Sequence, residues 1–253
     1  MSACCRRTGC AAVLAAAAAA HGAFAASVTP SGGSVPENLL RIELHLARPL
    51  SHALEMAHVR LVDENGEPIA GALLDLPLPG DGGRTITLLL HPGRVKTGVG
   101  ANLTMGRALR AGHDVALVVD DPQLPGPIRK RWHVTQAYDE GLLASGWRLT
   151  LPAIGSRSPL RVTLDSALTS SSASLIAVRA LGDERMAGVA SLRKGETVWE
   201  FVPTTPWRAD RYSLVLHPRL EDVAGNRPCT PFETRDLSTI PCVMEERGFD
   251  LAR

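Results

Sequence analysis

The second half of this chain repeats the first half, with its similar segments in the same order. Residues 40–44 recur as 160–164, residues 58–62 correspond to 177–181, and residues 115–119 correspond to 212–216. The offset falls from about 120 residues at the first pair to about 97 at the last, so the copies differ mainly in loop length. A repeat of this size exceeds the solenoid unit of about 20–50 residues. It predicts two small domains in tandem.

The apolar runs of the chain are short, alternate with polar residues and end at Gly, Pro, Asn or Asp. This spacing is typical of strands that bury one face. Helical spacing is scarce after residue 30, and residues 100–109 are the exception, where we expect one helical turn. Strands in this number without intervening helices predict an all-β fold of two tandem antiparallel β-sandwiches.

Residues 1–26 have the pattern of a cleavable export signal. Arg6 and Arg7 precede the apolar run of residues 11–20, and residues 23–25 form a small-x-small cleavage site. The run is shorter than the roughly 20 residues that span a bilayer, so no transmembrane span is expected in the mature chain. We expect a periplasmic, cell-surface or secreted protein.

The predicted boundaries follow from the repeat and the signal. They are a first sandwich over 28–136 with an extra loop, a linker over 137–146, a second sandwich over 147–236, and a C-terminal tail over 237–253. Cys229 and Cys242 are the cysteines left after cleavage, and in an oxidising compartment they are a candidate disulfide; two free thiols are the alternative. The mature chain carries nearly equal numbers of basic and acidic residues, which disfavours nucleic acid as a partner.

Several motifs resemble a known family. Residues 35–41 lead into a strand, and the second copy ends with Tyr212-Ser213-Leu214 and the turn segment 222–226. These motifs resemble bacterial Ig-like domains of the S-layer (SbsA) type, although residues 46–50 depart from the family's Phe-Ser-x-Pro-Met-like element. The resemblance covers most of the mature chain. It implies an Ig-like fold in an exported bacterial two-domain protein without an assigned activity.

One loop of the first copy has no counterpart in the second. Arg94 and Lys96 follow a strand and a Pro-Gly pair, and Arg107 and Arg110 come shortly after. If the chain stays extended, Arg94 and Lys96 point the same way. Such cations hold a phosphate, a carboxylate or an acidic glycan, with Arg giving bidentate contacts. The alternative is a solvated loop.

A possible metal site lies earlier in the chain. His45, His52, Met56 and His58 fall within fourteen residues, and exported copper proteins use His and Met on similar sandwiches. The spacing is no recognised metal motif, and strand parity places His45 on a polar face. The alternatives are a copper or zinc site and separate surface histidines.

Signals for catalysis are weak. The sequence has no Gly-x-Ser-x-Gly elbow, no His-Glu-x-x-His motif and no phosphate-binding Gly-x-x-x-x-Gly-Lys. Residues 221–226 have calcium-type oxygen ligands, but they also suit a tight turn. Trp199, Phe201, Trp207 and Tyr212 suit either a sandwich core or a sugar-stacking surface, and their strand parity favours the core.

These observations predict a non-catalytic, exported binding or structural module without a cofactor. Its expected partner is an envelope protein or a glycan, bound through loops of the first domain. A periplasmic copper or zinc protein and a hydrolase accessory module are the alternatives.

Overall fold

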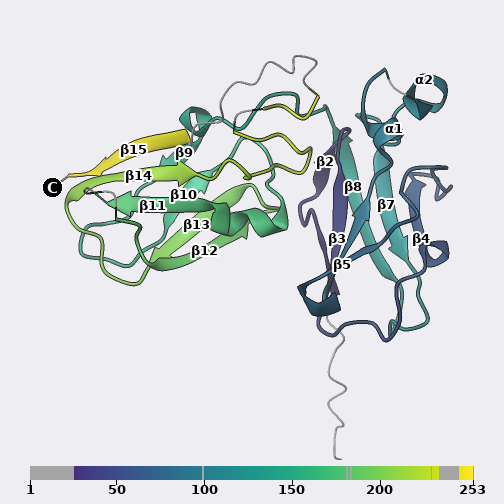
Figure 1. Ribbon diagram of the computed structural model, residues 1–253, viewed down its shortest axis with the longest axis horizontal. Coiled ribbons are helices and arrows are strands. Elements are labelled where there is room, and N and C mark those ends of the chain that lie inside the picture. Colours follow the sequence, from purple (N-terminus) through teal and green to yellow (C-terminus); the bar gives the residue numbers. More distant parts are fainter. Residues whose placement is uncertain are drawn as a thin grey trace, which may run out of the picture.

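Two separate bodies of strands lie side by side in the computed structural model (Figure 1). The structure describes residues 26–98, 100–180, 182, 184–228, 230–233 and 245–252. The predicted export signal, Cys229 and Cys242 lie outside these residues. Among the residues described, no helix is long and apolar enough to cross a membrane.

The first body contains two four-stranded sheets. One has the order β1 (Ala26–Thr29), β3 (Arg41–Leu46), β6 (Thr85–Leu89), β5 (Leu78–Gly80). The other has the order β2 (Ser34–Pro36), β8 (Ile128–Thr135), β7 (Asp114–Val119), β4 (Val59–Asp63). Every pairing is antiparallel except that of β2 with β8, which is parallel.

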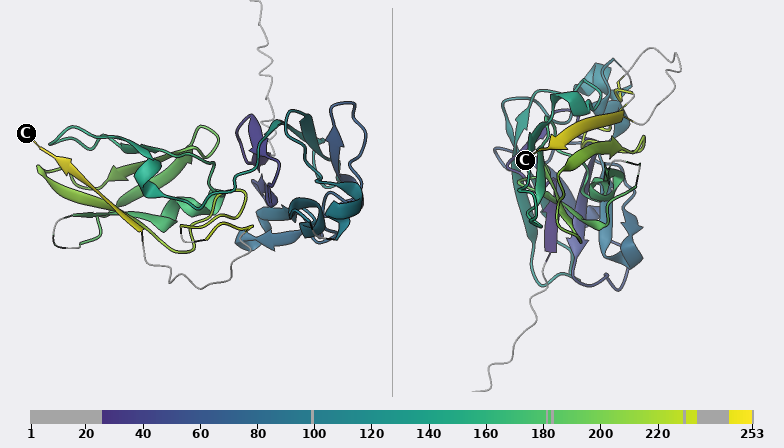
Figure 2. Two further views of the ribbon diagram at one scale, coloured as in Figure 1. Left: turned by 90° about the horizontal axis from the view of Figure 1, so that it is seen from above. Right: turned by 90° about the vertical axis from the view of Figure 1, so that its left-hand side faces the viewer.

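The second body contains a four-stranded and a three-stranded sheet, both antiparallel. The larger has the order β12 (Gly188–Arg193), β13 (Val198–Pro203), β10 (Leu160–Thr163), β9 (Arg148–Thr150). The smaller has the order β11 (Ile176–Ala180), β14 (Asp210–Leu216), β15 (Glu245–Leu251). Figure 2 shows this body and the first as separate units that meet along one side.

These strand orders are those of immunoglobulin sandwiches, in which strands A, B, E and D form one sheet and C, F and G the other. In the first body, β1, β3, β6 and β5 take the places of A, B, E and D. In the second, β9, β10, β13 and β12 do so. The chain therefore consists of two tandem Ig-like β-sandwiches, as predicted. The repeated segments are the B, C and F strands of the two domains.

A tyrosine also marks strand F of the second domain. The hydroxyl of Tyr212, at the start of β14, accepts from the backbone N–H of Arg208 (3.1 Å) and lies 3.2 Å from its carbonyl oxygen. This is the tyrosine corner of Ig-like sandwiches. The B and F strands are not joined by a disulfide, because Val162 and Leu214 point into the core there.

Each sandwich has its own core, built from the alternate residues of its strands. Ile42, Leu44 and Leu46 of β3 are buried in the first cluster, and Leu160 and Val162 of β10 in the second. The second core is filled by stacked and edge-on rings, with neighbouring centroids 5.2–6.1 Å apart; these are Trp199, Phe201, Trp207, Tyr212 and Phe249. The core interpretation of the aromatic residues is confirmed, and the sugar-stacking surface is wrong.

The segment predicted to be a tail forms a strand. β15 pairs along its length with β14, so that Phe249 faces Tyr212 and Leu251 faces Asp210. It is strand G, the counterpart of β8 in the first domain. The second sandwich therefore extends to Leu251, beyond the expected boundary at residue 236. The weak signal was alternation, because buried Phe249 and Leu251 flank exposed Asp250.

Among the residues that the structure describes, helical segments are short, from three to six residues each. α1 (Pro92–Val95) and α2 (Ala101–Met105) lie in the extra loop of the first domain. Four 3-10 turns are found at Met56–His58, Asp81–Gly83, Ala144–Gly146 and Ser170–Leu175. α2 confirms the predicted helical turn, whereas α1 was not expected: Arg94 lies in a helix and not in an extended chain.

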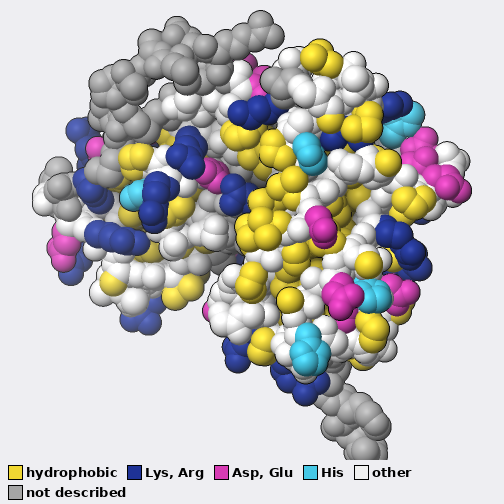
Figure 3. Space-filling view, turned by 45° about the vertical axis from the view of Figure 1, so that its right-hand side comes forward, with side chains coloured by type: hydrophobic (Ala, Val, Ile, Leu, Met, Phe, Trp, Pro, Cys, Tyr) yellow, Lys and Arg dark blue, Asp and Glu magenta, His cyan; other side chains and the backbone are white. Residues whose placement is uncertain are grey.

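A long connection covers one side of the first sandwich. Residues 64–77 run from the end of β4, at the edge of one sheet, to β5, at the edge of the other. Figure 3 shows many hydrophobic side chains on this side of the molecule.

Candidate functional site

Arg94, the first of the four predicted ligand-binding cations, is buried within the first domain. Its side chain donates to the carbonyl oxygen of Gly106 (Nε, 2.8 Å) and to that of Ala70 (Nη1). Only 5% of the residue is exposed. α1 turns the side chain inward, where it joins the extra loop to the connection before β5. Arg94 is a structural residue, so the prediction that it binds a ligand is wrong.

Two of the remaining cations contact the end of the second domain. The Lys96 ammonium lies 4.5 Å from the centre of the Phe232 ring, a cation–π contact. Arg107 binds Glu37 (2.8 Å) within its own domain and lies 3.7 Å from Glu233. The loop predicted to hold an external anion therefore holds residues 232 and 233 of the same chain. Both cations are only half-buried.

Arg110 is exposed. It lines a cavity of about 310 Å³ together with Arg107, His113 and several carboxylates, namely those of Asp63, Glu64, Glu67 and Asp114. His113 lies 3.0 Å from Glu64 and lowers the pKa of that carboxyl mainly through a hydrogen bond. Because both signs of charge line the cavity, it has no clear preference for an anion.

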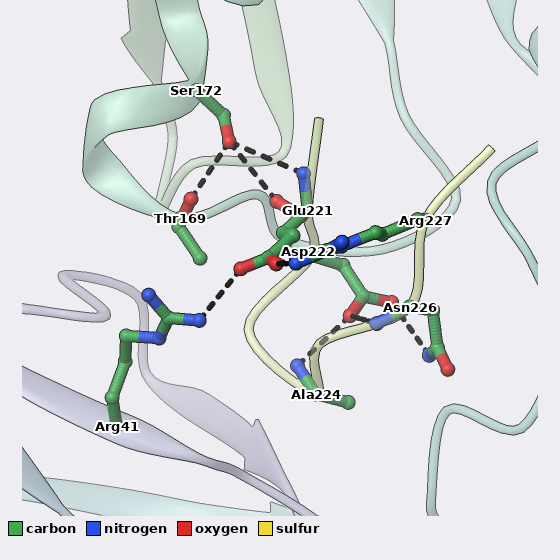
Figure 4. Close-up of polar contacts among 8 residues, drawn as sticks. All are labelled: Arg41, Thr169, Ser172, Glu221, Asp222, Ala224, Asn226 and Arg227. Atoms are coloured by element: carbon green, nitrogen blue, oxygen red, sulfur yellow. Dashed lines mark hydrogen bonds and ion pairs between the residues drawn. The ribbon is translucent and has the colours of Figure 1, made fainter. Parts of the chain in front are cut away.

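The loop contacts belong to a larger interdomain junction, which we define as the contacts of residues 31–43 and the extra loop with the second domain. At its centre, Glu221 binds Arg41 of β3 (2.6 Å) and Arg227 of its own domain (Figure 4). The Glu221 side chain is only 15% exposed. A carboxylate held by two guanidinium groups in partial burial is screened less by salt than a surface pair.

Two further polar contacts lie beside this centre. Glu43 of β3, itself buried, accepts from the hydroxyl of Ser170 in the second domain. Glu196 accepts from the backbone N–H (2.7 Å) and the hydroxyl (2.6 Å) of Ser31. Each pair joins residues more than a hundred positions apart in the sequence.

The backbones of the two domains approach closely at two glycines. A Cβ atom on Gly195 would lie 2.6 Å from the Cα atom of Gly32, and Gly195 has a φ of +68°. Gly225, with a φ of +83°, faces the Leu40 side chain. Only glycine combines this conformation with so little room. The junction is therefore shaped by sterics as well as by charge.

The turn predicted as either a calcium loop or a tight turn lies in the same junction. The Asp222 carboxylate accepts from the backbone N–H groups of Ala224 and Asn226 (2.9 Å each) and from the Asn226 amide (2.9 Å). These donors occupy the oxygens that a cation would need, which favours the turn. Burial raises the pKa of Asp222 to about 6 despite these hydrogen bonds.

One atom of the linker binds both domains. The Tyr138 carbonyl oxygen accepts from the amides of Asn38 (3.0 Å), in the first domain, and Asn226 (2.7 Å), in the second. The Leu40 N–H also donates to the Val223 carbonyl oxygen (3.0 Å). The short connection thus forms part of the junction.

The predicted metal ligands are not gathered into one site. His45 lies in β3, 3.0 Å from the Thr29 hydroxyl, whereas His58 ends the 3-10 turn that precedes β4 in the other sheet. His52 is exposed, and Met56 packs against the first core. Within the described part of the chain, no three His, Cys, Asp or Glu residues form a group able to hold a metal ion.

Sequence reasoning missed most of the junction residues and singled out only Lys96, Arg107 and the segment 221–226, each for another role. Arg41, Glu43 and Glu196 were not singled out, because each lies in a strand or turn with no local signal, and Glu221 was noted only as part of a possible calcium loop or turn. The partner of Glu43, Ser170, lies 127 positions away in the sequence, and the partner of Arg41, Glu221, lies 180 positions away. The one weak signal in the sequence is Gly195 next to Glu196 in a turn between strands, a pair that could have indicated a close contact at this turn.

Comparisons with known proteins do not add to the fold assignment. No protein-family model and no curated protein matches the chain. The titin Ig tandem domains A164-A165 are 11% identical, with 90% of this chain and 95% of theirs covered, at a TM-score of 0.26. Rst D1-D2 is 8% identical (90% and 98% covered, TM-score 0.25), and the BSP domain of a biofilm associated protein 10% (77% and 26%, TM-score 0.27). Scores this low add nothing to the strand order, on which the fold assignment rests.

Proposed function

We propose that this chain is a non-catalytic, exported module of the bacterial cell envelope that holds two Ig-like domains in one fixed orientation. One observation carries the proposal, namely the interdomain junction. Ion pairs, hydrogen bonds and close glycine contacts join the domains at several separate points, where a flexible two-domain chain would have a free linker.

A fixed pair of domains suits a spacer or a presenting scaffold. Loops at the ends of Ig-like sandwiches commonly bind partners, and a rigid junction sets the distance and angle between the loops of the two domains. Lys96 and Arg107 of the extra loop already contact the second domain. We therefore expect a partner to bind other surfaces of the protein. An envelope protein or glycan is the partner class that we propose.

The experiment measures whether the domains tumble together. In weakly aligned NMR samples, residual dipolar couplings of the two domains should fit one alignment tensor. The variant Glu196→Ala/Glu221→Ala removes two of the carboxylates that reach across from the second domain, those that bind Ser31 and Arg41, so we expect two tensors. Glu200→Ala is the matched control, since Glu200 also binds two arginines, Arg161 and Arg193, but within the second domain.

Separate tensors in the unaltered protein would overturn the rigid-module proposal. Export is tested by cell fractionation and by mass spectrometry of the first residue of the purified protein. We expect the protein in the periplasmic or culture fraction, without residues 1–26. Recovery from the cytoplasm alone, with residues 1–26 still attached, would contradict export.

A further inference from the structure

The side of the first sandwich that carries the long connection is unusually apolar for a surface. Leu76 is 53% exposed and Leu78 is 39% exposed, and the preceding residues 68–74 are apolar throughout. Figure 3, in which this side is turned forward, shows hydrophobic side chains gathered on the first domain as an extended patch. Scattered apolar residues are normal on a surface, but a contiguous patch marks an interaction site. We call this surface the β4–β5 face.

A shallow groove of about 200 Å³ lies within the β4–β5 face. Its walls are mostly apolar and include Val59, Ile69 and Leu73, with one charge of each sign, Arg60 and Asp75. Neither charge has an ion-pair or hydrogen-bond partner among the described residues, and both are exposed. The groove is smaller than the roughly 300–1,000 Å³ of typical small-molecule sites, so a protein surface suits it better.

The edge strands beside the groove are closed to strand addition. Pro79 lies in the middle of β5 and Pro77 precedes that strand, so neither residue offers a backbone N–H to an incoming strand. On the other side, the outer edge of β4 is occupied by its own chain, since Ile69 donates to the Leu61 carbonyl oxygen (2.8 Å). A partner must therefore bind through side chains, which excludes an extended peptide added as a new strand.

We infer that the β4–β5 face binds a second copy of this chain across a two-fold axis. In such an interface each residue of the patch meets the same patch of the partner, so a charge at one position must find its opposite at another. The face meets this condition, because Arg60 of each copy is available for Asp75 of the other. Leu76 and Leu78 provide apolar area around the two ion pairs.

The two-fold arrangement accounts for both features of the face together. A lipid surface would suit the leucines but would leave Asp75 among apolar groups without a partner, which is costly. The face also lies away from the interdomain junction, so pairing leaves the relative orientation of the two domains unchanged. The inference therefore stands independently of the rigid-module proposal.

Charge reversal with rescue tests the inference, using the mature full chain in sedimentation equilibrium at several concentrations. We expect a monomer–dimer equilibrium for the unaltered protein. Asp75→Arg and Arg60→Asp should each raise the dimer dissociation constant at least about tenfold, because like charges then meet. The double variant Asp75→Arg/Arg60→Asp should restore dimer formation. Leu76→Ser should also weaken the dimer, at little cost to folding, since Leu76 is exposed.

Arg131→Asp is the matched control, because Arg131 is exposed on β8, which β7 separates from β4, and does not line the groove, so it should leave the dissociation constant unchanged. A monomer at every concentration would overturn the inference. So would a dimer insensitive to both single reversals, or a double variant that remains as weak as the singles. Far-ultraviolet circular dichroism on each variant shows that the fold is retained.

Discussion

At the scale of single residues, the extra loop shows how neighbours of one chemical type take different roles. Arg94 and Arg110 belong to the same segment and carry the same charge, yet Arg94 is buried among carbonyl oxygens and Arg110 is exposed. Burying a guanidinium group is costly unless its N–H groups are satisfied. Gly106 and Ala70 supply the acceptors, so Arg94 joins two segments that lack regular structure.

Replacing Arg94 should therefore affect stability and not ligand binding. We expect Arg94→Ala to lower the free energy of unfolding by about 2–3 kcal/mol, because it leaves buried carbonyl oxygens unpaired. Urea denaturation measures the change. Arg110→Ala, in the same segment, is the control and should alter stability by less than about 0.5 kcal/mol. Equal effects of the two substitutions would show that Arg94 does not have this structural role.

At the scale of elements, β15 decides whether the second sandwich is complete. It covers the free edge of β14 and carries Phe249 into the core, where its ring stacks on Tyr212 with centroids 5.5 Å apart. An uncovered edge strand invites association with other chains. β15 becomes the edge strand in place of β14, and its charged residues, such as Glu246 and Arg247, discourage such association.

Phe249→Ala should cost about 3–4 kcal/mol of unfolding free energy, as is usual when a buried aromatic side chain is removed. The measurement is the midpoint of thermal or urea unfolding. Glu246→Ala on the same strand is exposed and should change the midpoint little. A near-neutral Phe249→Ala would mean that residues 245–251 are not part of the folded sandwich.

At the scale of the whole molecule, the junction makes the stability of the protein depend on pH through Asp222. Its pKa of about 6 in the folded chain exceeds the ordinary value of 3.8, because the carboxyl is buried. The folded state therefore binds this proton more tightly than the unfolded state. The stability contributed by protonation is fully present below about pH 4 and is lost as the pH rises through about 6.

We expect Asp222 to make the protein roughly 1 kcal/mol more stable at pH 5 than at pH 7.5. The measurement compares urea unfolding of the unaltered protein and of Asp222→Asn at the two pH values. The variant lacks the titrating carboxyl, so this part of the difference should disappear, while contributions from histidines remain in both proteins. Identical pH dependence in the two proteins would rule out the raised pKa. Asp63, Glu64 and Glu200 have lowered pKa values and act only at more acidic pH.

Much of the architecture was accessible from sequence, because strand formation depends on local patterns. The alternation of Ile42, Leu44 and Leu46, and its repetition at Leu160 and Val162, predicted the two sandwiches and their cores. Strand β15 was missed because seven residues with several charges carry little hydrophobic signal. The candidate site was mostly missed: Lys96 and Arg107 were anticipated as cations for a ligand outside the chain, and the segment 221–226 as a calcium loop or a turn.

The sequence by itself determined the duplication, the all-β class and which side chains enter each core. These features follow from the spacing of apolar residues over five to seven positions, a range that a linear pattern records. Tertiary structure alone decided that Glu221 meets Arg41, that Gly32 meets Gly195, and that the cations of the extra loop bind this chain's own second domain. Those contacts join residues more than a hundred positions apart, and their energies depend on burial and distance, which arise only when the two domains pack together.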